Sequence, residues 1–211
     1  MMCVMIDPTM RFLRAVPLVV LLVSGACGSS TEPPSAAVRF PLRTWALSQD
    51  FGGWNDSWGG YHLAEDATAG GGDSVFAIAR GVVQELILNN VARGYGGIML
   101  VEHELPGETV TALYGHISSR RGTPVEVGDF VSAGELIAFI ADDDEDGGSW
   151  GPHMHFGIRR GDFDRYSTIC GAWLYVGYTR ACPQATHEQQ RSQWLDPSDH
   201  LSAHGAVLPE P

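Results

Sequence analysis

The sequence contains no lysine, and its 13 basic residues, all arginine, face 25 acidic residues, which gives a net charge of −12. A surface with this excess of negative charge repels phosphate, so no nucleic-acid partner is expected. Beyond the N-terminus no apolar run is long enough to span a bilayer. Hydrophobic residues nevertheless make up 44% of the 211 residues, which is enough for one folded domain with a core.

The one notable apolar segment, residues 15–23, follows Arg11 and Arg14 and ends before small residues that lead to Cys27. This order is typical of a secretory signal peptide, predicted over residues 1–26, with a buried N-terminal helix as the alternative. The cysteine closes a sequence similar to a bacterial lipoprotein cleavage box, which predicts lipid attachment there; plain secretion is the alternative. We therefore expect an exported protein of the bacterial cell envelope that touches the membrane only through that lipid.

The composition of the remaining chain predicts a linker, a folded domain and a C-terminal tail. Residues 27–43 begin with a stretch rich in serine and proline and are expected to form a flexible linker. Residues 203–211 are expected to be a loose tail. The folded domain is predicted between them, over residues 44–202.

Cysteine is scarce in that domain, where only Cys170 and Cys182 occur. Two thiols in an exported chain, on either side of a stretch typical of a hairpin, predict a structural disulfide within an insertion near residues 165–190. A zinc site built on this pair is disfavoured because its spacing matches no usual ligand pattern.

Beyond residue 40 the sequence consists of short segments rich in Val, Ile, Leu, Phe and Tyr, separated by glycine and other turn residues. No ten-residue segment there shows the apolar period of a helix. The pattern predicts a mainly β, antiparallel domain with few helices. The expected strands are residues 74–80, 82–88, 97–103, 110–118, 135–141 and 153–159.

Three short clusters hold histidine. His62 and Asp66 are four residues apart between glycine-rich turns, so an extended chain places both side chains on one face. A spacing of two, which also keeps side chains on one face of a strand, relates Tyr114 to His116 and His153 to His155. A lone strand histidine is more often a surface residue, but three clusters in this order favour a site.

Imidazole and carboxylate are ligands that zinc prefers, and a catalytic zinc has three protein ligands and an open position. His62, Asp66 and one histidine of the third cluster would supply such a set. Two histidines then remain, and a peptidase can use them to take a proton from water and to stabilise the developing oxyanion.

These clusters belong to an ordered series of motifs over roughly residues 45–160. The series comprises His62-x-x-x-Asp66, residues 76–83, Gly94-Tyr95-Gly96-Gly97, and residues 113–118, 125–137 and 151–156. It resembles the lysostaphin-type, or LytM-like, zinc endopeptidases of bacterial cell walls. The resemblance implies a single compact domain with two β-sheets and a central groove.

The resemblance also implies roles for individual residues. It implies zinc held by His62, Asp66 and His155, His116 and His153 as the catalytic pair, and Tyr114 in the cleft. The implied reaction is hydrolysis of peptide bonds in peptidoglycan cross-links or stem peptides. The alternative is a non-catalytic module that binds peptidoglycan or activates a cell-wall hydrolase.

Two positions depart from the family pattern. Ala64 stands where glycine is common, and Gly157 stands where many members carry glutamate. The second change puts a contact to substrate or to a ligand in doubt. Neither position is a predicted ligand, so activity is expected to persist.

Four other signals carry less weight. Residues 142–147 fit the opening of a calcium loop but lack its closing glutamate, and are interpreted as a solvated acidic loop. Ser149 lies in a Gly-x-Ser-x-Gly pattern without the strand and helix that a serine hydrolase requires. An aromatic group before His62 forms either a groove wall or loop packing: Trp54, Trp58 and Tyr61. The remaining histidines are expected at the surface or in turns: His103, His187, His200 and His204.

Overall fold

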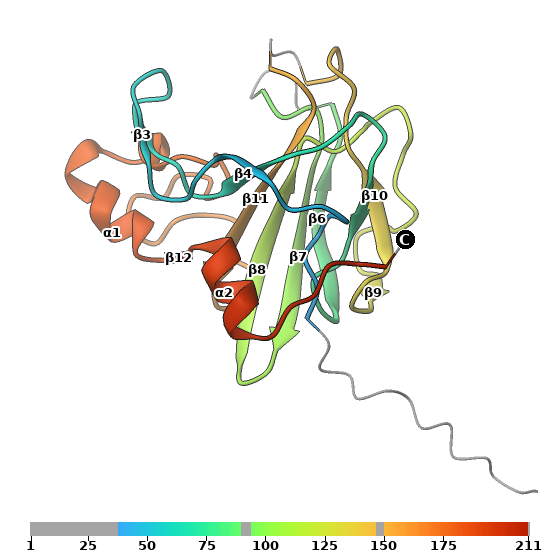
Figure 1. Ribbon diagram of the computed structural model, residues 1–211. Coiled ribbons are helices and arrows are strands. Elements are labelled where there is room, and N and C mark those ends of the chain that lie inside the picture. The colour runs from blue at the N-terminus through green and yellow to red at the C-terminus, as the bar shows by residue number, and fades with distance from the viewer. Residues whose placement is uncertain (1–37, 90–93, 147–149, 211) are drawn as a thin grey trace, which may run out of the picture. The chain divides into compact units, whose positions relative to one another are not determined.

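The computed structural model describes residues 38–89, 94–146 and 150–210 (Figure 1). The predicted signal peptide with Cys27 lies outside this part of the chain, and so does Ser149. Within the described part, no helix combines the length and the apolar character needed to cross a bilayer.

A large antiparallel sheet forms the centre of the domain, in the strand order β1-β4-β11-β8-β7-β6-β9, and β12 pairs with β11. Its strands are β1 (Leu47–Gln49), β4 (Glu65–Thr68), β6 (Gly81–Ile87), β7 (Ile98–Leu105), β8 (Glu108–Gly115), β9 (Phe130–Val131), β11 (His153–Arg160) and β12 (Trp194–Leu195). Two small sheets accompany it: β5 (Ser74–Phe76) pairs with β10 (Leu136–Phe139), and β2 (Trp54–Asn55) pairs with β3 (Gly60–Tyr61). The mainly β, antiparallel prediction is confirmed, and each predicted strand is present with its ends shifted by a few residues.

The central strands are apolar on both faces because both faces are covered. On β7, Met99 and Val101 belong to one buried cluster, whereas Ile98 and Leu100 belong to another. Since successive strand residues point to opposite faces, this alternation places a core on each side of the sheet. One core includes residues of β5 and β10, and the other includes Leu174 and its neighbours from the insertion.

Helices are few and short in the part of the chain that the structure describes. They are α1 (His187–Arg191), α2 (Pro197–Ala203) and the 3₁₀ turns η2 (Thr179–Ala181) and η3 (Gln184–Thr186). At the start of α2, the Asp196 side chain accepts a hydrogen bond from the backbone nitrogen of Asp199, at 3.0 Å, and Pro197 occupies the first turn. These are the capping residues that a helix start favours.

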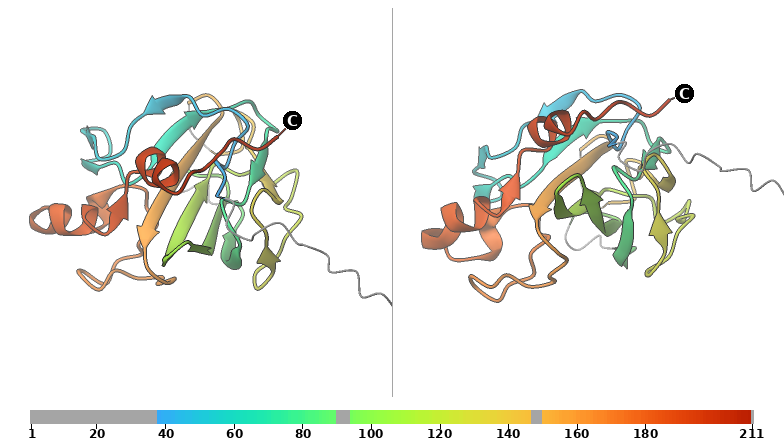
Figure 2. Two further views of the ribbon diagram at one scale, coloured as in Figure 1. Left: turned by 60° about the horizontal axis from the view of Figure 1, so that its bottom comes forward. Right: turned by 90° about the horizontal axis from the view of Figure 1, so that it is seen from below.

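The two ends of the described chain differ from the expectation of a flexible linker and a loose tail. Val38 and Leu42 are buried. The backbone nitrogen of Phe40 donates to the carbonyl of Val207, at 3.0 Å, so the segment after residue 38 runs beside the C-terminal segment (Figure 2). Burial of Val38 and Leu42, together with partial burial of Ala206 against the same core, explains the difference because it stabilises the docked arrangement.

Cys170 and Cys182 form a disulfide, with their Cα atoms 5.7 Å apart. The bridge closes a loop within the insertion. The backbone nitrogen of Leu63 donates to the carbonyl of Gly177 in that loop, at 2.9 Å. The disulfide therefore holds the loop beside the segment that leads into β4.

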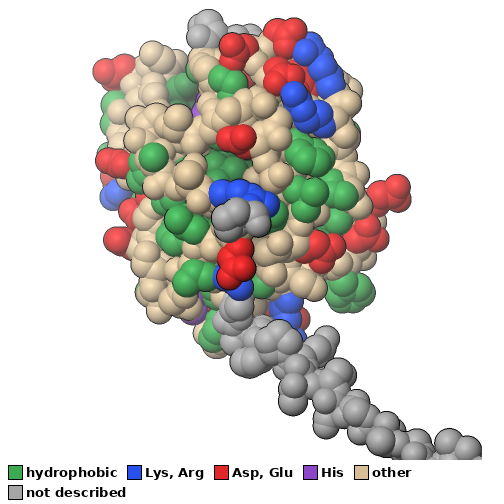
Figure 3. Space-filling view, turned by 45° about the vertical axis from the view of Figure 1, so that its right-hand side comes forward, with side chains coloured by type: hydrophobic (Ala, Val, Ile, Leu, Met, Phe, Trp, Pro, Cys, Tyr) green, Lys and Arg blue, Asp and Glu red, His purple; other side chains and the backbone are tan. Residues whose placement is uncertain are grey.

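The carboxylates of the acidic loop, residues 142–146 in the described chain, are held by arginine side chains, serine hydroxyl groups and backbone nitrogens. Figure 3 shows acidic side chains next to arginine side chains at one edge of the molecule. Arg120 pairs with Asp144 and Arg121 with Asp142. The buried Glu145 accepts hydrogen bonds from Ser118 and from backbone nitrogens. Because these carboxylates are already paired, they do not gather around a common point as calcium ligands do.

Candidate metal centre and cleft

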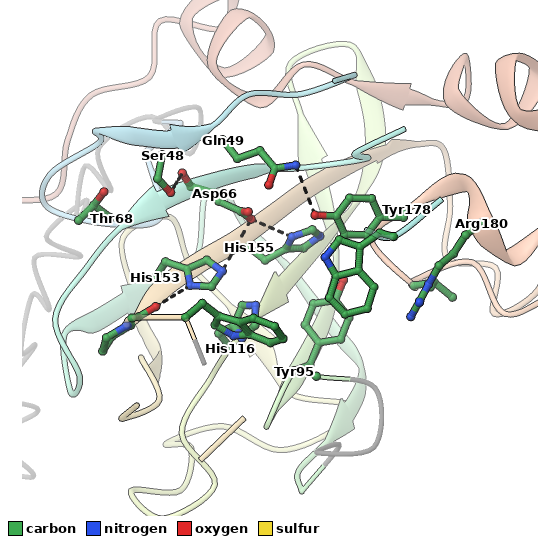
Figure 4. A pocket seen from close by; sticks show the side chains of 16 residues that line it. Ser48, Gln49, Asp66, Thr68, Tyr95, His116, His153, His155, Tyr178 and Arg180 are labelled. Atoms are coloured by element: carbon green, nitrogen blue, oxygen red, sulfur yellow. Dashed lines mark hydrogen bonds and ion pairs between the residues drawn. The ribbon is translucent and has the colours of Figure 1, made fainter. Parts of the chain in front are cut away.

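Two neighbouring strands bring the predicted ligands together. In the pairing of β11 with β4, His155 lies opposite Asp66. Directly opposed residues in an antiparallel pair have Cβ atoms about 5 Å apart, so their side chains meet. His62 precedes β4 and forms an isolated bridge with Tyr178 of the insertion. Figure 4 shows Asp66, His153 and His155 pointing toward one another from the two strands.

The three predicted ligand atoms form a small triangle. His155 Nδ1 lies 2.9 Å from Asp66 Oδ1 and 3.1 Å from His62 Nε2, and His62 Nε2 lies 3.4 Å from Asp66 Oδ1. Ligand atoms that surround zinc tetrahedrally at about 2 Å are about 3.3 Å apart. The triangle therefore has the size that a zinc ion requires, and His62, Asp66 and His155 form a possible metal site.

The surroundings of the triangle prepare it for a cation. His62 Nδ1 donates to the carbonyl oxygen of Asp50, at 3.0 Å, which leaves the Nε2 lone pair facing the other two ligands. Burial alone would raise the pKa of Asp66, but His155 and His62 outweigh burial and lower it. Burial lowers the pKa of His155 to about 4, against the opposing effect of Asp66. A charged carboxylate beside neutral imidazole is the protonation state that a metal needs.

A glycine in the disulfide loop lets the chain approach His155. Gly177 has a φ of +78°, a conformation that side chains disfavour. A Cβ atom there would lie 2.5 Å from His155 Nε2 and would also strike the Tyr95 hydroxyl. The loop therefore covers the far side of the His155 ring and fixes its orientation.

The two remaining histidines lie next to the triangle. The rings of His116 and His153 are 4.1 Å apart between centroids. His153 Nδ1 donates to the carbonyl oxygen of Gly151, at 2.9 Å, and His153 Nε2 lies 4.0 Å from Asp66 Oδ1. His116 Nδ1 lies 3.1 Å from Asp146 Oδ2, which is a buried ion-pair geometry. Burial lowers the pKa of His116, and Asp146 opposes that shift.

Tyr114 does not lie in the cleft, contrary to the expectation from the resemblance. It is fully buried in the core; its hydroxyl accepts from the backbone nitrogen of Ile78, at 3.1 Å, and donates to His103 Nε2, at 2.8 Å. The reason lies at His116, whose φ of 57° breaks the strand alternation after Gly115. Tyr114 thus points into the core while His116 lines the cleft.

His116, His153 and His155 line a cleft of about 420 Å³. Trp58, Trp150 and Tyr178 line it, and the Arg180 guanidinium lies over the Trp58 ring, 4.5 Å from its centroid. The other lining residues are Ser48, Gln49, Asp66, Thr68, Gly94, Tyr95, Gly151, Pro152 and Val176. Trp58 is therefore a wall of the cleft, whereas Trp54 packs against Tyr61, with ring centroids 5.2 Å apart.

Several residues at the site carry no sequence signal of their own. Asp146 belongs to a loop interpreted as solvated, yet it is buried and contacts both His116 and the Trp150 indole nitrogen, the latter at 2.9 Å. Tyr178 and Arg180 come from the insertion, far along the chain from the histidine motifs. The disulfide and the hairpin-like stretch marked their segment as ordered, but neither feature placed it at the cleft.

Other sequence expectations are corrected or explained by packing. His103 and His187 are buried, not at the surface or in exposed turns, with 0% and 5% of their area exposed. At Gly157, a Cβ atom would lie 2.7 Å from the Leu63 carbonyl oxygen and 2.9 Å from the Trp194 ring. The glutamate common in the family does not fit at this position, because the Leu63 backbone and the Trp194 indole occupy its space.

The comparisons with known proteins agree with this fold. Residues 60–166 match the sequence profile of Peptidase family M23. The structure of LytU aligns at 20% identity and a TM-score of 0.52, covering 77% of this chain and 88% of that one. The solution structure of lysostaphin aligns at 22% identity and a TM-score of 0.55, covering 84% of this chain and 60% of that one.

A third solved structure, the catalytic domain of lysostaphin from Staphylococcus simulans, aligns at 22% identity and a TM-score of 0.52, covering 75% of this chain and 92% of that one. At these identities the likeness establishes the fold. Among curated protein sequences, none matches this chain.

Proposed function

Because this chain belongs to peptidase family M23, we propose that it is a zinc-dependent endopeptidase that hydrolyses peptide bonds in peptidoglycan cross-links or stem peptides. One observation carries the proposal: His62, Asp66 and His155 form a possible metal site, and Asp66 and His155 line a cleft together with two further histidines, His116 and His153. A module that only binds peptidoglycan would need neither the three metal ligands nor the adjacent pair of histidines.

The proposed zinc ligands are His62 Nε2, Asp66 Oδ1 and His155 Nδ1. Bound there, zinc supplies a Lewis acid that polarises a peptide carbonyl and lowers the pKa of water. The protein's own contribution is to hold these three atoms at tetrahedral spacing before any ion arrives. The Asp50 carbonyl adds to this by fixing the His62 ring.

His153 is the proposed acceptor of the proton that the attacking water loses. Its Nδ1–H is directed to the Gly151 carbonyl, so its Nε2 carries the lone pair, 4.0 Å from the ligand oxygen of Asp66. A base must lie within reach of the proton that it removes, and the closeness of this nitrogen to a proposed metal ligand supports that role.

His116 is the proposed donor to the oxyanion. Its Nδ1 faces the Asp146 carboxylate, so its Nε2 is the nitrogen available to substrate. A buried carboxylate beside the ring stabilises the imidazolium and keeps the ring in one orientation. The neighbouring rings of His116 and His153, tilted by 46° to each other, place both functions next to the metal ligands.

The substrate is a peptide held along the aromatic walls of the cleft. A cleft of about 420 Å³ suits a few residues of peptide and not a folded protein chain. Peptidoglycan as the source of that peptide follows from the family.

The N-terminal sequence supports export to the cell envelope with a lipid on Cys27. If the lipid is attached, a Cys27→Ser variant should be lost from the membrane fraction.

The test is digestion of purified peptidoglycan by the purified protein, with a zinc chelator and with zinc restored. Peptide fragments that disappear with chelator and return with zinc support the proposal, and their masses identify the bond. Release that persists after complete metal removal contradicts zinc catalysis. Binding to peptidoglycan without release, in protein that contains zinc, favours a non-catalytic module.

A further inference from the structure

A second cluster of ligand atoms lies outside the cleft, between α2 and the β7–β8 hairpin. We propose that Glu108, His200 and His204 form a second, structural site for a transition-metal cation of the Zn²⁺ type. His200 lies in α2 and His204 caps the C-terminal end of that helix, and their ring centroids are 4.8 Å apart. Glu108, the first residue of β8, faces them.

The distances fit a shared ion. Glu108 Oε1 lies 3.3 Å from His200 Nε2 and 2.9 Å from His204 Nε2. All three ligand atoms fall within 4.8 Å of one another. Since zinc ligands in a tetrahedron are about 3.3 Å apart, the side chains need little movement to surround one ion.

One atom of the cluster is poorly satisfied without an ion. His200 Nε2 is buried and has no hydrogen-bond partner within the described part of the chain, although the carboxylate is near. Glu108 Oε1 is already shared with His204 Nε2 through a hydrogen bond. A cation at the centre would satisfy both imidazoles and the carboxylate together, which a single proton cannot do.

The ligand types select the class of metal. Two imidazoles and one carboxylate suit Zn²⁺, Ni²⁺ or Cu²⁺, whereas Ca²⁺ and Mg²⁺ prefer oxygen ligands. The side chains are partly exposed, by 32% for Glu108, 13% for His200 and 16% for His204, so water can complete the coordination. None of the three residues lines the cleft that holds His116, His153 and His155, so the second site is separate from the proposed catalytic centre, and its position between α2 and the hairpin gives it a structural role.

The contacts of α2 with β4 show what an ion at the second site would stabilise. Ser198 of α2 donates to Glu65 Oε2, at 2.7 Å, and accepts from the Trp45 indole nitrogen, at 2.8 Å. Glu65 is the neighbour of Asp66 on β4. An ion that fastens α2 to the hairpin would therefore stabilise the helix that supports the strand carrying a proposed catalytic ligand.

The test is the number of Co²⁺ or Zn²⁺ ions bound per chain, measured by equilibrium dialysis and by cobalt absorbance. The intact protein should bind two ions, and His155→Ala and His204→Ala one each. The double variant should bind none. A Ser202→Ala variant, altered on the exposed side of α2, is the control and should bind two.

Glu108→Gln provides a second variant, since glutamine keeps the shape but not the charge of the ligand. It should weaken the second ion at least tenfold, and zinc should raise the Tm of His155→Ala but not of His155→Ala with Glu108→Gln. If His155→Ala binds no ion, or His204→Ala loses none, the second site does not exist. Peptidase activity does not enter this readout, so the second site can fail while the proposed function stands.

Discussion

His116 Nδ1 lies 3.1 Å from Asp146 Oδ2, and both side chains are buried. An Asp146→Asn variant replaces the carboxylate with an amide that cannot stabilise a positive imidazole ring. We expect kcat on a peptidoglycan peptide to fall about 10- to 100-fold, with KM, zinc content and Tm little changed. Asp144→Asn, which alters an exposed carboxylate of the same loop, is the control and should retain full kcat. Equal kcat values for the two variants would show that Asp146 does not support His116 in catalysis.

The Tyr114 hydroxyl should matter for stability and not for catalysis. A Tyr114→Phe variant leaves the Ile78 amide and His103 Nε2 without their partner in the core. We expect the free energy of unfolding to fall by about 2 kcal/mol, measured by urea denaturation. kcat/KM should be unchanged at a temperature where the variant is folded. A large loss of kcat in a variant that remains stable would show that the Tyr114 hydroxyl contributes to catalysis.

His103 should make the protein sensitive to acid. Burial lowers its pKa from the ordinary 6.5 to about 4, so the folded protein resists a proton that the unfolded chain accepts below pH 6.5. Stability therefore falls as the pH drops from 7 to 5, and this residue contributes about 2 kcal/mol of that loss. In His103→Gln the loss over the same interval should be smaller by that amount, as followed by denaturation at both pH values. Parallel losses in the two proteins would show that His103 is not the group responsible.

The disulfide should support both the fold and the cleft. Cys170 and Cys182 are 12 residues apart, and closing a loop of this length stabilises a protein by about 3 kcal/mol. The loop carries Tyr178 and Arg180 to the cleft. Replacing both cysteines by serine should lower the Tm and raise KM more than it lowers kcat. An unchanged KM would mean that the loop holds its place without the bridge.

The part of the site that the sequence predicted comes from regular strands. The spacing of His153 with His155 survives because β11 is extended and paired in register with β4, which places His155 opposite Asp66. His62 precedes β4 and is held by its bridge to Tyr178. Two-residue periodicity is a reliable guide within such strands. It failed one residue beyond β8, where the left-handed backbone of His116 separates it from the face of Tyr114.

The part that the sequence did not predict comes from loops. Asp146 meets His116 only because the acidic loop folds back over the end of β8, and no spacing rule connects residues 30 apart. Tyr178 and Arg180 reach the cleft through an insertion whose course depends on tertiary packing and a disulfide. Burial of His103 was missed for a related reason: a histidine in an apolar strand is satisfied by partners from other elements.

The central claim is that His62, Asp66 and His155 hold the catalytic zinc while His153 takes the proton from the attacking water. The most direct measurement compares zinc content and peptide release for three proteins that all carry His204→Ala, which removes the second metal site. The first carries no other change, the second adds His155→Ala, and the third adds His153→Ala. The account predicts one zinc and peptide release for the first, neither for the second, and one zinc with at least 100-fold slower release for the third. Undiminished release by the His155→Ala protein, free of zinc, would contradict it.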